Sequence, residues 1–368
     1  MHDIQPILQT LTEALLRKLG DEVDLIFQYG SHLRGNTHQY SDVDISYVPV
    51  HEATWDSITV MVGETMCDLY PIHWSHLERM ADFRSVSASV LLNHRILYQR
   101  TEAAGARMQA LAARLRALQA PEARPDMVRR AQEIFQETGY GYYLLRRQAE
   151  AGHLAGCLKQ AHAILQTVLH CLAVYNQACI DTRKLAQALA LPSLPPEFGA
   201  TVQRVLAADE VDELLTATDA LLHTTRELLL AGQRELPPAE RAYSTVFDAA
   251  YPELKRDLQG VMLACERQDM LAVKSSLFSL LHELSRAIAE ATTGFVCSDF
   301  HGLSEYEADW TALGFPPLLP YAVAQDFAGL RRQCLAFDRC LQTFLSERGV
   351  SLNRFATLDE LQSFLGAR

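Results

Sequence analysis

The first hundred residues switch between helical and strand-like spacing of apolar positions. Apolar residues between Ile4 and Leu19 recur every three or four positions, which predicts an amphipathic helix that covers a sheet. Helices are also expected over residues 52–63 and 85–93, and Pro49 is expected to end a strand. Short apolar runs predict four strands, over residues 23–29, 42–48, 66–73 and 95–99.

The pattern changes from about residue 101 onward. Long stretches rich in Leu, Ala, Gln, Glu and Arg contain no convincing strand, which predicts an all-helical remainder. Proline interrupts helices, so proline-containing stretches mark helix ends and domain edges at residues 121–125, 191–196, 236–238 and 314–320. The expected fold class is α+β, with a small sheet domain over residues 1–100, a helical domain over 101–236 and a second helical domain over 237–368.

A duplicated helical module is an alternative description of the helical region. Residues 165–198 and 277–320 share a loose plan, a Leu-rich helix followed by an irregular stretch with a Pro-Pro pair.

Composition and charge narrow the class of protein. The 368 residues are 49% hydrophobic, enough for several folded cores. The formal net charge of −12 argues against tight non-specific binding to DNA or RNA, because phosphate neutralisation needs a clustered Lys/Arg surface. A nucleotide or a cationic small molecule remains compatible with this charge.

Targeting and cysteine patterns predict a cytoplasmic protein with no membrane partner. The eight cysteines are scattered, without a CxxC pair or His/Cys ligand spacing, which is typical of reduced thiols. Charges interrupt every apolar run before it reaches membrane-spanning length, and the N-terminus lacks a basic region and a cleavage site.

One stretch, QYGSHLRGNTHQYSDVDI at residues 28–45, concentrates the candidate chemistry. Side chains alternate along a strand, so Asp42 and Asp44 point to one face while Val43 and Ile45 point into a core. Two adjacent carboxylates repel unless a hard divalent cation such as Mg²⁺ lies between them. A solvated pair of aspartates at a strand edge is the alternative.

The loop before these aspartates suits an anion. Gly30 and Ser31 follow the first strand directly, where backbone N–H groups can approach a phosphate and the serine hydroxyl can donate to it. Arg34 adds a positive group, although a salt bridge that pins the loop is an equal alternative for it. Gly35 allows a tight return of the chain.

Taken in this order, the residues resemble the signature of the DNA polymerase beta-like nucleotidyltransferase superfamily, hG[GS] followed by DhDh. The family pattern includes a third carboxylate on a neighbouring strand; Asp68 fits that position, and Glu64 is its nearest competitor. The resemblance implies a small mixed sheet and two Mg²⁺ ions. It implies that the catalytic and metal-binding residues are Asp42, Asp44 and Asp68, and that the nucleotide-binding residues include Gly30, Ser31, Arg34 and Ser41.

The resemblance also implies the reaction. The chain looks like the minimal and the aminoglycoside (kanamycin-type) nucleotidyltransferases with a helical C-terminal domain, so ATP or another NTP is the expected donor. A nucleoside monophosphate, most simply AMP, would pass to the hydroxyl of a small molecule such as an antibiotic. Glu133 and Glu137, one helical turn apart, would attract a cationic acceptor or act as base, with a solvated helix face as the alternative. Lys184, in the loop NQACIDTRK, would reach the triphosphate.

Other functions stay open at this point. A toxin–antitoxin or regulatory enzyme of the same superfamily would modify tRNA or a protein instead. Arg147 and His153 match the Arg-x(4–6)-His spacing of a helical nuclease, but so short a pattern is common by chance. A binding protein with a decayed site is a further alternative. Residues 237–368 exceed what a minimal enzyme needs and would enclose a bulky acceptor, form a homodimer or bind a partner.

Overall fold

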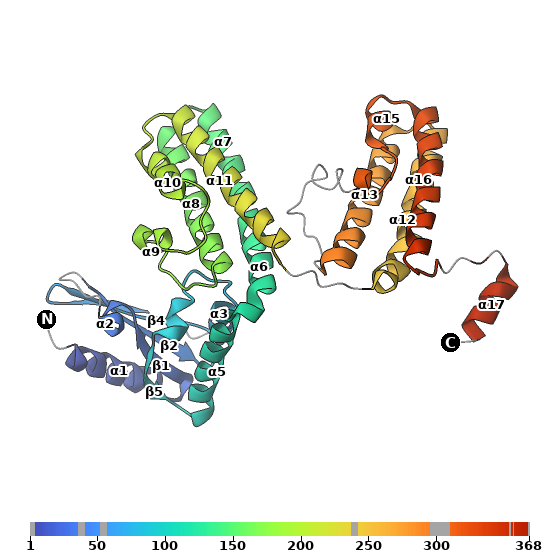
Figure 1. Cartoon of the computed structure of the whole chain (residues 1–368). Helices are drawn as coiled ribbons and strands as arrows, with labels where there is room; N and C mark the ends of the chain where they lie inside the picture. The colour runs from blue at the N-terminus through green and yellow to red at the C-terminus, as the bar shows by residue number, and fades with distance from the viewer. Residues whose placement is uncertain are drawn as a thin grey trace. The chain divides into compact units, whose positions relative to one another are not determined.

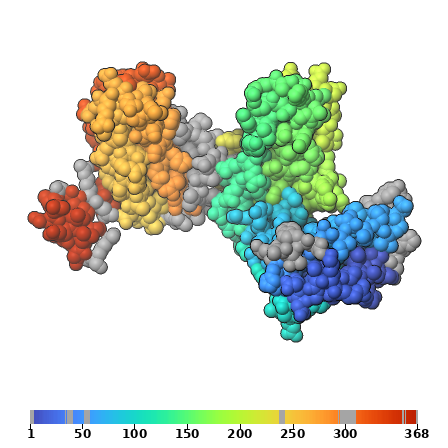
Figure 2. Space-filling view, turned by 180° about the vertical axis from the view of Figure 1, so that it is seen from behind, coloured from blue at the N-terminus to red at the C-terminus, as the bar shows by residue number. Residues whose placement is uncertain are grey.

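In the computed structural model the chain forms two compact units, Met1–Leu236 and Pro237–Arg368 (Figure 1 and Figure 2). The predicted division into three domains, with a boundary near residue 100, stays a prediction. In the part of the chain that the structure describes, no helix is long and apolar enough to cross a membrane. The described residues are 4–35, 41–51, 57–236, 242–294, 310–352, 355 and 357–366.

A five-stranded mixed sheet forms the N-terminal part of the first unit. Its strands lie in the order β3-β4-β2-β1-β5. β2 and β4 run parallel, and the other neighbouring pairs are antiparallel. The mixed sheet with its flanking helices confirms the predicted α+β class. The strands are β1 Val23–Tyr29, β2 Val43–Pro49, β3 Ile58–Val62, β4 Thr65–Pro71 and β5 Arg95–Gln99.

Helices cover both faces of this sheet. Helix α1 (Gln5–Leu19) lies on one face, and its buried leucines share one apolar core with β1, β2 and β4. That core includes Leu8, Leu15, Ile26, Val43, Ile45, Tyr47, Cys67 and Leu69. Helix α5 (Glu102–Leu118) contacts β1 and β5 and packs against α3 (Trp74–Ala81) and α4 (Ser89–Leu92). The opposite side of β1, with Leu25 and Phe27 fully buried, is therefore also covered.

The helix expected over residues 52–63 is wrong where the structure describes this segment. Residues 52–56 lie outside the described part of the chain, and Ile58–Val62 forms strand β3. The segment ITVMV contains four β-branched residues in five, which favours a strand. Val62 pairs with Thr65 across a two-residue turn that starts with Gly63 at φ +60°, as a type II′ hairpin requires. The apolar residues of 58–62 therefore belong to an edge hairpin.

The helical part of the first unit surrounds one long central helix, α8, which contacts α6, α7, α10 and α11 (Figure 1). Among the described residues, no strand follows β5, as the sequence predicts. The helices are α6 Arg124–Gln136, α7 Thr138–Glu150, α8 Leu154–Tyr175, α9 Leu185–Leu189, α10 Phe198–Ala207 and α11 Val211–Arg234, with 3₁₀ turns at Gly20–Glu22 and Pro121–Ala123.

In the second unit, all the regular elements among the described residues are helices. Helix α12 packs along α13 and α16 around an apolar core. Residues 295–309 lie outside the described part of the chain, and the duplicated module stays a prediction. The helices are α12 Tyr243–Glu266, α13 Met270–Thr293, α15 Leu319–Val323, α16 Phe327–Glu347 and α17 Leu358–Gly366.

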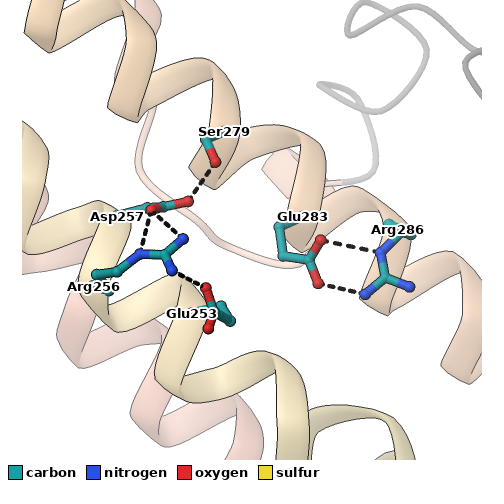
Figure 3. Close-up of polar contacts among 6 residues, drawn as sticks. All are labelled: Glu253, Arg256, Asp257, Ser279, Glu283 and Arg286. Atoms are coloured by element: carbon teal, nitrogen blue, oxygen red, sulfur yellow. Dashed lines mark hydrogen bonds and ion pairs between the residues drawn. The ribbon is translucent and has the colours of Figure 1, made fainter.

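One nearly buried carboxylate joins two helices of the second unit (Figure 3). Asp257 on α12, only 9% exposed, accepts hydrogen bonds from Ser279 on α13 at 2.5 Å and from the neighbouring Arg256 at 3.0 and 3.1 Å. Glu283 and Arg286 form a second ion pair along α13. Buried charges need such partners, so this cluster is explained by helix packing.

Replacing Ile45 tests whether the residues that alternate with Asp42 and Asp44 along the strand are buried in the core. Ile45→Ala removes a fully buried side chain from the core under α1 and should cost about 2–5 kcal/mol of unfolding free energy. Val60→Ala, on the exposed edge strand β3, is the matched control and should cost about 0.5 kcal/mol or less. Urea unfolding followed by fluorescence measures both, and equal costs would contradict the burial described here.

Candidate functional site

Four residues form one row across four neighbouring strands of the sheet. Tyr29 on β1 pairs with Asp44 on β2, which pairs with Asp68 on β4, and Asp68 pairs with Thr59 on β3. Residues opposite each other in a sheet project from the same face, so two carboxylates lie side by side. Thr59 donates a hydrogen bond from Oγ1 to Asp68 Oδ1 at 2.8 Å. Both aspartates keep partial exposure and remain accessible to a ligand.

Asp42 directly precedes β2 and stands two residues before Asp44. Val43 and Ile45 are fully buried, whereas Asp42 and Asp44 are partly exposed, which is the alternation predicted from the sequence. Ser41, at the start of this segment, is buried with 6% of its surface exposed. The sheet therefore sets Asp44 beside Asp68, and Asp42 precedes Asp44 by two residues.

Gly30 lies against the carboxylate of Asp44. Its φ of +91° and ψ of −162° belong to a region that only glycine occupies readily. A Cβ at this position would lie 2.0 Å from Asp44 Oδ2. Two independent reasons therefore favour glycine here: its backbone conformation, and the Asp44 carboxylate that occupies the space of a side chain.

The turn after Gly30 presents an unused hydroxyl. Ser31 begins the short helix α2 (Ser31–Arg34), and its Oγ is buried without a hydrogen-bond partner among the described residues. Buried hydroxyls are normally paired, so this atom suits a ligand that supplies an acceptor. The side chain of Arg34 lies outside the described part of the structure.

Two tyrosines that the sequence analysis did not single out border the carboxylates. The hydroxyl of Tyr29 donates to the hydroxyl of Tyr70 at 2.8 Å, and the two rings meet edge to face. Burial, followed by the neighbouring Tyr70 and the charge of Asp44, raises the pKa of Tyr29 well above its usual range. Tyr29 therefore stays protonated beside Asp44. The period of two along a strand could have identified Tyr70 from the sequence, because it stands two residues after Asp68 and so shares its face.

A second positive group comes from the segment between α8 and α9. The guanidinium of Arg183 donates from Nε and Nη2 to Asp181 at 3.0 and 3.2 Å. Asp181 raises the pKa of Arg183 most, and the charges of Asp42 and Asp44 raise it further. Both effects stabilise the charged form of Arg183. The residue predicted from the sequence to reach the triphosphate is its neighbour Lys184, an exposed residue that precedes α9.

Hydrogen bonds at both ends hold this segment in place. Gln177 donates from its side chain to the carbonyls of Leu118 and Ala120, at the end of α5. Asn176 exchanges hydrogen bonds of 2.8 Å with the backbone of Ser193. Gln187 accepts from the backbone N–H of Asp181 at 2.9 Å. The loop that carries Arg183 is therefore anchored to both the preceding and the following helices.

Comparisons with known proteins assign no family. No protein-family model matches the chain, and no curated protein is significantly similar to it. Among solved structures, it is similar to a nucleotidyltransferase-like protein from Exiguobacterium sibiricum 255-15. That likeness has 14% sequence identity and a TM-score of 0.37, and covers 62% of this chain and 80% of the other. It is too distant to carry an argument, so the site is interpreted from its own residues.

The acids predicted for the acceptor side are exposed on the helical part. Glu133 lies on α6, and Glu137 lies where α6 meets α7. Tyr140 and Tyr143 on α7 are exposed and stacked on each other, with ring centroids 6.4 Å apart. Arg147 forms an ion pair with Glu150 on the same helix. The acceptor-side roles stay predictions.

The carboxylate set fits a hard divalent cation. Among the described residues, no group of three or more His, Cys, Asp or Glu side chains has the arrangement of a metal site. Mg²⁺ does not require one, since it commonly takes one or two protein carboxylates together with water and substrate phosphates. Asp42 and Asp44 supply two such carboxylates, and the buried Ser31 hydroxyl, which has no hydrogen-bond partner among the described residues, can donate to a phosphate oxygen.

Substituting Gly30 tests the contact between the turn and Asp44. Gly30→Ala should cost at least about 2 kcal/mol of unfolding free energy, because it strains the backbone and displaces the Asp44 carboxylate. Gly35→Ala is the matched control, since Gly35 also has a positive φ, of +69°, but open space around a Cβ. Thermal unfolding should show the larger loss for Gly30→Ala, and an equal or smaller loss would contradict the packing.

Proposed function

We propose that the protein is a metal-dependent nucleotidyltransferase. The observation that carries the proposal is the packing of Gly30 against Asp44, which sets the Gly-Ser turn directly beside the carboxylates. The Gly-Ser turn suits a triphosphate and the carboxylates suit a cation. Nucleotidyl transfer needs both groups bound at one place. ATP is the proposed donor and AMP the transferred group.

The proposed reaction transfers a nucleoside monophosphate from the triphosphate to the acceptor hydroxyl. The acceptor hydroxyl oxygen bonds to the α-phosphorus, the bond from that phosphorus to the bridging oxygen breaks, and pyrophosphate leaves. Bound Mg²⁺ would lower the pKa of the attacking hydroxyl and neutralise the charge of the leaving group. The residues of the sheet hold and orient these groups.

Each residue has a role that its position supports. Asp42 and Asp44 would hold the cation, and Asp68, beside Asp44, would complete the carboxylate set and accept the hydroxyl proton. The hydroxyl of Ser31 would donate to a phosphate oxygen. Tyr29 keeps its proton next to Asp44 and so adds no further negative charge to the site.

The proposed acceptor is a cationic small molecule such as an aminoglycoside. The net charge of −12 and the exposed Glu133 and Glu137 support a cationic acceptor over a polyanion. Transfer of AMP to an antibiotic hydroxyl would confer resistance. A tRNA or protein acceptor is the alternative that the assay below distinguishes.

Labelled transfer tests the proposal. Each α-labelled NTP is incubated with the protein, Mg²⁺ and one of three acceptors, namely aminoglycosides, bulk tRNA or a protein lysate. Label on the antibiotic is the expected result, with ATP as the best donor. Label on tRNA or protein would show that the acceptor is not a small molecule. Absence of transfer together with absence of NTP binding would contradict the proposed activity.

Removing either aspartate should abolish this transfer. Asp42→Ala and Asp44→Ala should each lower turnover at least about 10³-fold, since a bound cation contributes several kcal/mol to the transition state. Arg129→Gln, which breaks an exposed ion pair with Asp126, should leave turnover unchanged. Near-normal turnover in either aspartate variant, with circular dichroism like that of the parent protein, would rule out the two-aspartate site.

A further inference from the structure

Two tyrosines form a hydrogen-bonded bridge across strand β2. Tyr29 on β1 donates its hydroxyl proton to the hydroxyl of Tyr70 on β4 at 2.8 Å, and the two ring centroids lie 6.4 Å apart with the rings at 89°. Strand β2 lies between β1 and β4, and its Ser46, which pairs with Tyr70 in the parallel register, is fully buried. We call Tyr29 and Tyr70 the tyrosine bridge.

The tyrosine bridge lies on the side of the carboxylates away from the Gly-Ser turn. Along β4, Tyr70 follows Asp68 on the same face, about 7 Å further on, since a strand rises about 3.3 Å per residue. The Gly-Ser turn lies towards the other end of the row, because β1 runs antiparallel to β2 and its last residue, Tyr29, pairs with Asp44. Along the strands, Asp44 and Asp68 are therefore placed between the turn and Tyr70.

The hydroxyl of Tyr70 has a proton for a further partner. A tyrosine hydroxyl donates one hydrogen bond, and Tyr29 uses its proton on Tyr70. Burial raises the pKa of Tyr29 and so keeps that proton in place. Tyr70 accepts in this bond, so its own proton points elsewhere, and in the described part of the chain no group accepts it. Since Tyr70 is partly exposed, a ligand can reach this proton.

We propose that Tyr70 binds the acceptor molecule by donating its hydroxyl proton to an acceptor oxygen, and that Tyr29 holds Tyr70 in this orientation. The inference rests on the proposed function. In that reaction the attacking and leaving oxygens lie roughly in line at the phosphorus. Pyrophosphate leaves at the Gly-Ser turn, so the acceptor approaches from the opposite side, over Asp68, where Tyr70 stands.

This placement favours an acceptor with several oxygen atoms. Asp68 would receive the proton of the reacting hydroxyl, so Tyr70, two residues further along β4, would bind a different oxygen of the same molecule. As a donor, Tyr70 pairs with an oxygen and not with an ammonium group, which has no free lone pair. An amino sugar carries such neighbouring oxygens, and its C–H groups can pack against the tyrosine ring.

Replacing either tyrosine by phenylalanine breaks the same bond but removes a different proton. Tyr70→Phe removes the proton offered to the acceptor and should weaken acceptor binding about tenfold, the effect of one hydrogen bond. Tyr29→Phe also breaks the bridge but leaves that proton, so it should weaken binding less than about threefold. Tyr98→Phe removes a hydroxyl from β5, where the ring packs on the core under α1, and should leave binding unchanged.

The measurement is a calorimetric titration of the full-length protein with kanamycin, an aminoglycoside, in the presence of Mg²⁺ and a non-hydrolysable ATP analogue. Affinity for the ATP analogue is measured separately and should be unchanged in Tyr70→Phe. Monodeoxy derivatives of kanamycin identify the oxygen bound by Tyr70. The derivative that lacks it should bind the parent protein about tenfold more weakly than kanamycin does, but Tyr70→Phe as well as kanamycin does. Circular dichroism of each variant controls for the fold.

The results separate this inference from the function beneath it. Weaker kanamycin binding by Tyr70→Phe, with unchanged affinity for the ATP analogue, would support it. Equal losses in Tyr29→Phe and Tyr70→Phe would indicate a purely structural bridge and overturn it, as would unchanged kanamycin binding in Tyr70→Phe. If the parent protein binds the ATP analogue but not kanamycin, the proposed acceptor is wrong and the inference fails with it. If it binds neither, the nucleotidyltransferase activity itself is contradicted.

Discussion

The repulsion between two carboxylates on one face of a strand is the constraint on which the site depends. Asp42 and Asp44 flank the fully buried Val43, so the strand cannot turn them away from each other without exposing its core. Several residues around the two carboxylates adapt to their negative charge. Gly30 leaves space for the Asp44 carboxylate, Tyr29 stays protonated beside it, and the charges of both aspartates help to raise the pKa of Arg183.

The fold around this strand explains why the site lies where it does. The apolar core under α1 fixes which residues of β1, β2 and β4 point inward, and the remaining residues are thereby set on the opposite face. Tyr29, Asp44 and Asp68 come from three different strands but share one row. A site built from neighbouring strands is held by the sheet itself, which limits the movement of the carboxylates.

Local patterns were sufficient to predict the central part of this arrangement. The period of two around Val43 predicts the aspartate face, and the order of Gly30, Ser31 and the aspartates predicts their association. The spacing of apolar residues before Leu19 predicts α1. The strand β3 was missed because the turn at Gly63 decides between a hairpin and a helix, and a helical window over residues 52–63 spans that turn. Hairpin pairing outweighs such short periodicity.

Long-range features had no comparable signal in the sequence. The charges of Asp42 and Asp44 help to raise the pKa of Arg183, although these residues are far apart in the sequence, and no local spacing reveals this. The choice of Lys184 over Arg183 rested on resemblance, whereas the bond between Arg183 and Asp181 is a matter of geometry. In the second unit, Asp257 and Ser279 likewise meet only after α12 and α13 pair.

We propose that Asp42 and Asp44 hold a cation beside a phosphate-binding turn. The most direct test is a crystal structure with Mn²⁺ and a non-hydrolysable ATP analogue, in which anomalous scattering locates the metal. We expect a Mn²⁺ peak between Asp42 and Asp44, with the triphosphate on the Gly30–Ser31 turn. A metal or nucleotide bound elsewhere, with these aspartates in contact only with water or protein, would contradict it.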